Sequence, residues 1–236
     1  MSKPQLFCFS YAGGNASFFD LTEKDLTEYD LVKLEYPGHG AKHKEAFCRD
    51  FDELAYDLFG SFINQYSGGR YALFGYSMGA IAAVEVLKRI IGGKEINAPD
   101  RMFLAAHEPH SRAELEGYAG DCTDEWIKER TISFGAIPEK LIGNKAFWRM
   151  YLPIYRADYS LIRNYRFEEL ALKTPVPATV FYSETDTPRK DMELWSRYFV
   201  GECEYFGFGG GHFFILEHHK EMAEIMNSKI LQGNLS

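Results

Sequence analysis

The sequence has few cysteines, no long apolar run and no excess of positive charge. Its 236 residues include four widely scattered cysteines, Cys8, Cys48, Cys122 and Cys203, with no Cys-x-x-Cys pair among them. This spacing argues against structural disulfides and against a metal site, so we expect reduced thiols in a cytoplasmic protein. The formal charge of −8 gives no basic field that would attract phosphate, which argues against a nucleic-acid partner.

No stretch approaches the length of a membrane span, and the apolar run Leu6–Phe9 is too short for a signal peptide. The composition, 46% hydrophobic and 25% charged, is that of an ordinary soluble globular protein. The length suits one α/β domain with room for an insertion. We therefore expect a single domain over residues 1–236, monomeric and not bound to membranes.

The most informative motif is Gly75-Tyr76-Ser77-Met78-Gly79. The apolar run Tyr71–Phe74 before it predicts a buried strand, and apolar residues at helical spacing in Ala80–Ile91 predict a helix. A sharp strand-to-helix turn would present the Ser77 hydroxyl as a nucleophile, and the Met78 amide at the helix N-terminus would favour an anion. The alternative is an ordinary glycine-rich turn with an N-cap serine.

Other short apolar runs alternate with helical patterns along the chain. Helices are expected over residues 50–66 and from about residue 215, and strands at Gln5–Ser10, Leu31–Tyr36, Arg101–Ala106, Ala178–Ser183 and Glu204–Phe208. This alternation indicates an α/β fold with a mostly parallel central sheet flanked by helices. Ligands bind beyond the carboxyl ends of such strands, where Ser77 would lie. The glycine-rich turn after the first strand would complete an oxyanion hole through the amide of Ala12.

Two late segments supply partners for Ser77, because a serine hydroxyl needs a base that is itself oriented by a third group. Asp186 follows the strand at 178–183 and is the expected carboxylate, with Glu184 and Asp191 in reserve. His212 follows three glycines and is the expected general base. The order Ser77, Asp186, His212 is that of an α/β-hydrolase.

Two other segments, a Pro-Gly loop and a long strand-free stretch, bear on the site. His39 and His43 lie in a Pro-Gly loop and are expected on the surface rather than in a catalytic role. Residues from about 111 to 168 contain no convincing strand and carry many apolar side chains, which predicts a helical lid insertion over the site.

Five segments in order resemble the type II thioesterases, the stand-alone editing hydrolases of nonribosomal peptide and polyketide synthesis. They are LFCFSYAGGNAS, LEYPGHG, YALFGYSMGAIAAVEVLKR, LPIYRADYSLIRNYRF and FGGGHFF, within a resemblance that runs from about residue 5 to 232. The resemblance implies an α/β-hydrolase fold and hydrolysis of acyl or aminoacyl thioesters from the phosphopantetheine arm of carrier protein domains. It also implies Ser77, Asp186 and His212 as the triad, the Ala12 and Met78 amides as the oxyanion hole, and no metal or diffusible cofactor.

The chain departs from the usual family pattern at several positions, none of which removes a catalytic group. The departures are Ser10 for proline, Tyr76 for histidine, His39 for the arginine of Pro-Gly-Arg, Ser183–Asp186 for a glycine-led turn, and His107-Glu108 for Gly-Arg. They leave the substrate open. A medium-chain fatty acyl-carrier thioesterase and a general carboxylesterase or acyltransferase remain alternatives, because fold and triad do not choose between them. A non-catalytic binding subunit is a further alternative, against which the intact triad argues.

The charge pattern of residues 140–166 suggests where a carrier protein would dock. Six basic residues lie there against a single acid, Asp158. Carrier proteins are acidic, so we expect a transient docking surface that includes Lys140, Lys145 and Arg149. The alternative is that these basic residues pair with nearby acids on a solvated helix face.

Overall fold

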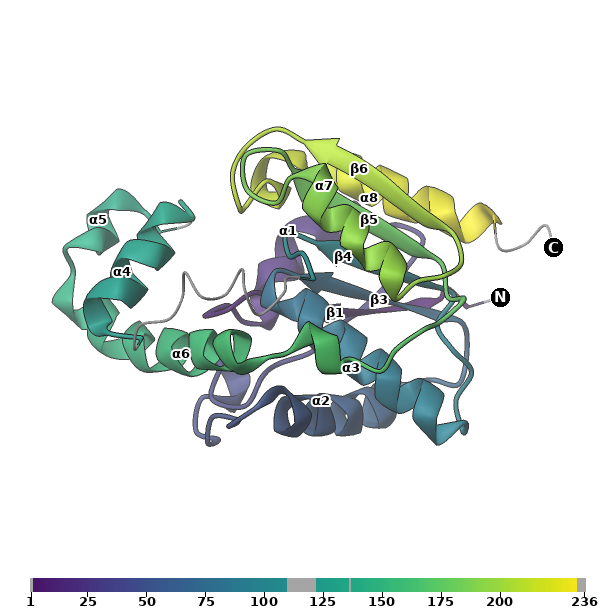
Figure 1. Cartoon of the computed structure of the whole chain (residues 1–236), viewed down its shortest axis with the longest axis horizontal. Coiled ribbons are helices and arrows are strands. Elements are labelled where there is room, and N and C mark those ends of the chain that lie inside the picture. Colours follow the sequence, from purple (N-terminus) through teal and green to yellow (C-terminus); the bar gives the residue numbers. More distant parts are fainter. Residues whose placement is uncertain (1, 110–121, 136, 233–236) are drawn as a thin grey trace.

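A single sheet of six parallel strands lies at the centre of the computed structural model, which describes residues 2–109, 122–135 and 137–232 (Figure 1). The strand order is β2-β1-β3-β4-β5-β6, and every neighbouring pair is parallel. The strands are β1 (Gln5–Phe9), β2 (Asp30–Lys33), β3 (Tyr71–Tyr76), β4 (Arg101–Ala105), β5 (Ala178–Ser183) and β6 (Cys203–Phe208). The predicted parallel α/β sheet is confirmed.

Helices cover both faces of this sheet, with α2 and α3 on one face and α1 and α8 on the other (Figure 1). The helices are α1 (Asp20–Glu23), α2 (Phe51–Gln65), α3 (Met78–Gly93), α4 (Asp124–Ser133), α5 (Glu139–Ile142), α6 (Lys145–Asn164), α7 (Arg189–Met192) and α8 (Ile215–Gln232). One-turn 3-10 helices occur at η1 (Ala16–Phe19), η2 (Gly40–Lys42), η4 (Phe167–Glu169) and η5 (Glu193–Arg197).

Strand β1 shows how the sequence fills two cores. Phe7 and Phe9 pack with α2 and α3 on one face, while Leu6 and Cys8 pack with α8 on the other. All four side chains are fully buried. Because both faces are covered, the strand is apolar at every position from Leu6 to Phe9 rather than alternating with polar residues.

Predicted element bounds differ from the observed ones by a few residues. The second strand ends at Lys33 instead of Tyr36, because the chain turns at Pro37 and the amide of His39 donates to the carbonyl of Tyr36. The third strand runs on to Tyr76, so only Ser77 separates it from α3. Helix α2 begins as predicted after Asp50, whose carboxylate caps the amide of Glu53.

The stretch between β4 and β5 is helical where it is described. Helices α4, α5 and α6 lie there, with α4 packed on α6, and α4 and α5 extend away from the sheet (Figure 1). The first part of the predicted lid, residues 111–121, lies outside the described residues. That these helices act as a lid on a single domain stays a prediction.

Two further observations concern the described chain as a whole. All four cysteines are free thiols. In the part of the chain that the structure describes, the helices are too short or too polar to cross a lipid bilayer.

Candidate active site

Ser77 lies at the sharp turn between β3 and α3. Its backbone φ of 55° and ψ of −123° is strained for a residue with a side chain, and its amide donates to the Ala105 carbonyl at 2.8 Å. The flanking glycines make the turn possible. A Cβ on Gly75 would lie 2.2 Å from the Gly79 carbonyl oxygen, and one on Gly79 would lie 2.0 Å from that of Phe9. Only glycine fits these two positions. The segment therefore has the predicted strand–turn–helix geometry.

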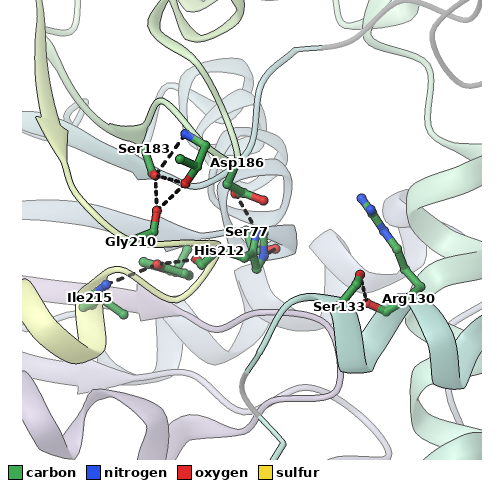
Figure 2. Close-up of polar contacts among 10 residues, drawn as sticks. Ser77, Arg130, Ser133, Ser183, Asp186, Gly210, His212 and Ile215 are labelled. Carbon is green, nitrogen blue, oxygen red and sulfur yellow. Dashed lines mark hydrogen bonds and ion pairs between the residues drawn. The ribbon is translucent and has the colours of Figure 1, made fainter.

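The structure brings the three predicted catalytic residues together (Figure 2). The Ser77 hydroxyl lies 2.8 Å from His212 Nε2, and His212 Nδ1 lies 2.7 Å from Asp186 Oδ2. Since a carboxylate only accepts hydrogen bonds, Nδ1–H donates to Asp186 and leaves Nε2 to accept the serine proton. Ser77 and His212 are each 7% exposed, so the hydrogen bond between them is largely shielded from solvent, whereas Asp186 is partly exposed.

A second set of hydrogen bonds holds the two loops that carry Asp186 and His212. The hydroxyls of Ser183 and Thr185 both donate to the Gly210 carbonyl, the latter at 2.6 Å (Figure 2). The Tyr76 hydroxyl donates to the His212 carbonyl at 2.7 Å. Tyr76 and Ser183, two of the departures from the family pattern, therefore fix the backbone next to His212 and Asp186.

The two predicted oxyanion donors flank Ser77. Met78 is the first residue of α3, where backbone N–H groups have no partner inside the helix. Ala12 follows β1 and lines the same cavity as Ser77. Its loop is a tight turn in which Gly13 has a φ of 79° and the Gly14 amide donates to the Tyr11 carbonyl at 2.9 Å. The role of both amides as oxyanion donors stays a prediction.

A cavity of about 140 Å³ opens beside Ser77, between the sheet and the lid helices. Its wall is partly aromatic, with Phe134, Tyr155 and Tyr159, and partly polar. The polar part consists of His107, Glu108, Arg130 and Thr131. Burial lowers the pKa of His107 to about 4, so this imidazole is neutral near pH 7. Sequence analysis did not assign His107 to the site, although its place directly after β4 is a usable signal.

Phe134, the residue that follows helix α4, contacts His212. The Phe134 ring lies over the His212 ring, with centroids 4.0 Å apart and planes 30° apart. The Arg130 guanidinium in turn lies 4.3 Å from the centre of the Phe134 ring. Figure 2 shows Arg130 and Ser133 on this helix, where the Ser133 hydroxyl donates to the Arg130 carbonyl at 2.8 Å. The covering aromatic comes from the predicted lid.

The predicted docking residues lie outside the cavity, on α5 and α6. Lys140, Lys145 and Arg149 are exposed. Across residues 2–109, 122–135 and 137–232, none of the three forms an ion pair. Arg156, by contrast, pairs with Asp124. The exposure of Lys140, Lys145 and Arg149 fits the docking hypothesis, which stays a prediction.

The expectation for His39 was wrong, whereas His43 is exposed as predicted. His39 is 3% exposed, and its Nε2 lies 2.9 Å from Asp158 Oδ2. Asp158 is itself 2% exposed and pairs with His39. The error arose because sequence position alone does not show that α6 folds back over this loop.

The fold and the geometry around Ser77 define an α/β-hydrolase of the serine–histidine–aspartate type. Among the described residues, no group of three His, Cys, Asp or Glu side chains is arranged to hold a metal ion. Residues 4–230 match the family model described as a thioesterase domain, so the chain belongs to the thioesterase family.

Individual relatives agree with this assignment. The crystal structure of ClbQ, from the colibactin NRPS/PKS pathway, has a TM-score of 0.87 at 26% identity, covering 98% of each chain. The type II thioesterase BorB, from the borrelidin biosynthetic cluster, has a TM-score of 0.82 at 26% identity, covering 97% of this chain and 93% of BorB. The human medium-chain S-acyl fatty acid synthase thioesterase is 28% identical, over 92% of this chain and 83% of the relative. The predicted recognition as a type II thioesterase is confirmed.

Proposed function

We propose that this protein hydrolyses acyl or aminoacyl thioesters from the phosphopantetheine arm of a carrier protein, and so clears mis-primed or stalled units from a synthase. The observation that carries the proposal is the Ser77–His212–Asp186 hydrogen-bond chain beside a partly enclosed cavity, in a chain of the thioesterase family. The pathway named for ClbQ and the cluster named for BorB support the synthase context.

The side chains account for the chemistry without a metal or a diffusible cofactor. His212 Nε2 takes the proton of Ser77 as the serine oxygen attacks the thioester carbonyl. The oxyanion is held by the Ala12 and Met78 amides, each worth about 3 kcal/mol in comparable sites. The pantetheine sulfur leaves with the proton from His212. Water, deprotonated by His212, then cleaves the acyl-serine and frees the acid.

The cavity favours a short acyl group. Its volume of about 140 Å³ is small beside the roughly 300–1,000 Å³ of typical small-molecule pockets. The polar wall at His107, Glu108 and Thr131 suits an amino or hydroxyl substituent. Similarity to the human medium-chain enzyme favours a second candidate, a medium-chain fatty acyl thioesterase. A ten-carbon chain, however, would have to extend out of this cavity or displace the helices that line it.

Intact-mass spectrometry of loaded carrier proteins tests the proposal. Acetyl, aminoacyl and decanoyl groups would be mounted on the same phosphopantetheinyl carrier and incubated with the protein, alongside p-nitrophenyl esters. We expect the acetyl and aminoacyl masses to disappear fastest. Fastest loss of decanoyl would favour the medium-chain candidate. Cleavage of p-nitrophenyl esters with every carrier left intact would instead indicate a general carboxylesterase.

We further propose that the protein acts as a monomer and that it works in the cytoplasm.

We also propose that the carrier docks transiently on the lid. Lys145 and Arg149 are four residues apart and therefore share one face of α6. Arg149 also borders an open groove of about 600 Å³ that includes Phe47 and Trp148. Positive charge beside an apolar groove suits the acidic surface of a carrier domain.

Charge reversal at Lys145 and Arg149 should weaken docking without altering the chemistry. We expect the Lys145→Glu/Arg149→Glu variant to raise KM for an acyl-carrier about tenfold or more at low salt, since steering charges act on encounter rates. Turnover of an acyl N-acetylcysteamine thioester should stay as in the wild type. Lys24→Glu/Lys220→Glu, an equal charge change at two exposed positions away from α5 and α6, is the matched control. Equal losses on both substrates would contradict the docking surface.

A further inference from the structure

Asp158 joins the lid to the loop that follows β1. It lies on α6, and its Oδ2 accepts the Gly13 amide at 2.6 Å and faces His39 Nε2 at 2.9 Å. Gly13 and Asp158 are 145 residues apart in the chain, and this contact is buried. A buried carboxylate is costly unless it is paired and hydrogen-bonded, so these two partners account for its presence in the core.

The partners of His39 define its protonation state. Its Nδ1 lies 3.0 Å from the Pro37 carbonyl oxygen, and its Nε2 faces the Asp158 carboxylate. Both partners are acceptors, so both ring nitrogens must donate, which only the imidazolium form can do. Glu35 adds a further negative charge nearby, while the rings of Tyr36 and Phe47 pack edge-on against the imidazole. Burial by itself would lower the pKa of His39, but the hydrogen bond and the charge of Asp158 outweigh burial and raise the pKa.

The loop held by Asp158 carries the Ala12 amide. Gly13 follows Ala12 directly and has a φ of 79°. The Gly13 N–H lies in the peptide plane that joins the two residues, so holding it also holds the Cα and carbonyl of Ala12, next to the Ala12 N–H. Tyr155, one turn before Asp158 on α6, packs against the same glycine, because a Cβ there would lie 2.0 Å from the Tyr155 ring. Helix α6 thus fixes this turn by a hydrogen bond and by direct packing.

We propose that Asp158 and His39 are positioning residues for the reaction. Asp158 holds the Gly13 amide so that the neighbouring Ala12 amide points at the oxyanion, and the His39 imidazolium holds Asp158 in place. The inference rests on the proposed role of the Ala12 amide. The proposal also makes the loop after β1 depend on a lid helix. The Ala12 N–H points at the oxyanion only when α6 packs against this loop.

The pH dependence follows from the sign of the His39 shift. Because the folded pKa lies above the ordinary value of 6.5, the stabilisation is fully present below about pH 6.5 and is lost as pH rises through the raised pKa. We therefore expect kcat for an acyl N-acetylcysteamine thioester, corrected for background hydrolysis, to fall on the alkaline side. The midpoint of thermal unfolding should fall over the same pH range.

Three variants separate positioning from a structural role. Asp158→Ala should lower kcat about 10²-fold, the loss expected for one oxyanion donor, with a much smaller change in KM. His39→Arg keeps a permanent charge and should retain activity while removing the alkaline loss of kcat. Tyr165→Phe is the control, because it removes another hydrogen bond between the end of α6 and the core, the 2.7 Å contact with Glu85. It should leave kcat and the pH profile unchanged.

These measurements test the positioning role and the proposed function separately. No thioester turnover by the wild type would remove the proposed function itself. Wild-type turnover that stays constant through the alkaline fall in thermal midpoint would overturn the positioning role, and so would an unchanged kcat in Asp158→Ala. If Asp158→Ala does not fold, the positioning role is still tested by the alkaline fall in kcat of the wild type. That fall should be absent in His39→Arg.

Discussion

Replacing Ser77 by alanine is expected to lower kcat for acyl-carrier hydrolysis by about 10⁴- to 10⁶-fold. The hydroxyl lies 2.8 Å from His212 Nε2 at the strained apex of the turn, where its oxygen is the attacking atom of the proposed mechanism. Alanine keeps the backbone of the elbow and removes only this atom. The measurement is single-turnover loss of the acyl mass from the carrier, with the unfolding midpoint as a check on folding.

Two comparisons make this result specific. Ser10→Ala is a matched control, because Ser10 is also buried and its hydroxyl has no hydrogen-bond partner in the described part of the chain. It should keep wild-type turnover. Adding His212→Ala to Ser77→Ala should cost little more, because the two residues act as a unit. Wild-type turnover by Ser77→Ala would contradict the role of Ser77 as nucleophile. It would favour a non-catalytic binding subunit or a different nucleophile.

The elbow could be predicted from sequence because its determinants are local. The apolar run, the two glycines and the helical spacing after Ser77 all belong to one segment of about twenty residues. The close approaches of Gly75 and Gly79 to backbone carbonyls show why neither position admits a side chain. The positions of Asp186 and His212 followed from the same logic, since each comes directly after a strand of a parallel sheet.

Features that depend on how the lid meets the core could not be predicted. His39 lies in a polar loop and has no local sign of burial; it is buried because Asp158 arrives from α6, 119 residues later. Phe134 is one of many apolar residues in the predicted lid. Nothing in the sequence shows which of them covers His212. In each case the deciding contact joins segments whose relative placement has no local signal.

Replacing Asp186 by asparagine is expected to lower kcat by about 10⁴-fold without a comparable loss of stability. Asp186 Oδ2 lies 2.7 Å from His212 Nδ1, and its negative charge stabilises the imidazolium that forms as Ser77 is deprotonated. An asparagine of the same shape supplies no charge. Through its amide nitrogen it can also hold the imidazole in the tautomer that leaves Nε2 protonated and unable to accept the serine proton.

The reserve carboxylates provide the matched controls for this change. Glu184 lies two residues before Asp186 and is exposed, and Asp191 lies five residues after it on α7. Glu184→Gln and Asp191→Asn alter the same charge near the same loop, so a general electrostatic effect would lower kcat in all three variants. We expect a large loss only in Asp186→Asn, measured as kcat on one acyl-carrier. A loss confined to Glu184→Gln or Asp191→Asn would assign the orienting carboxylate to that residue, and would imply that this loop rearranges when the carrier arm enters.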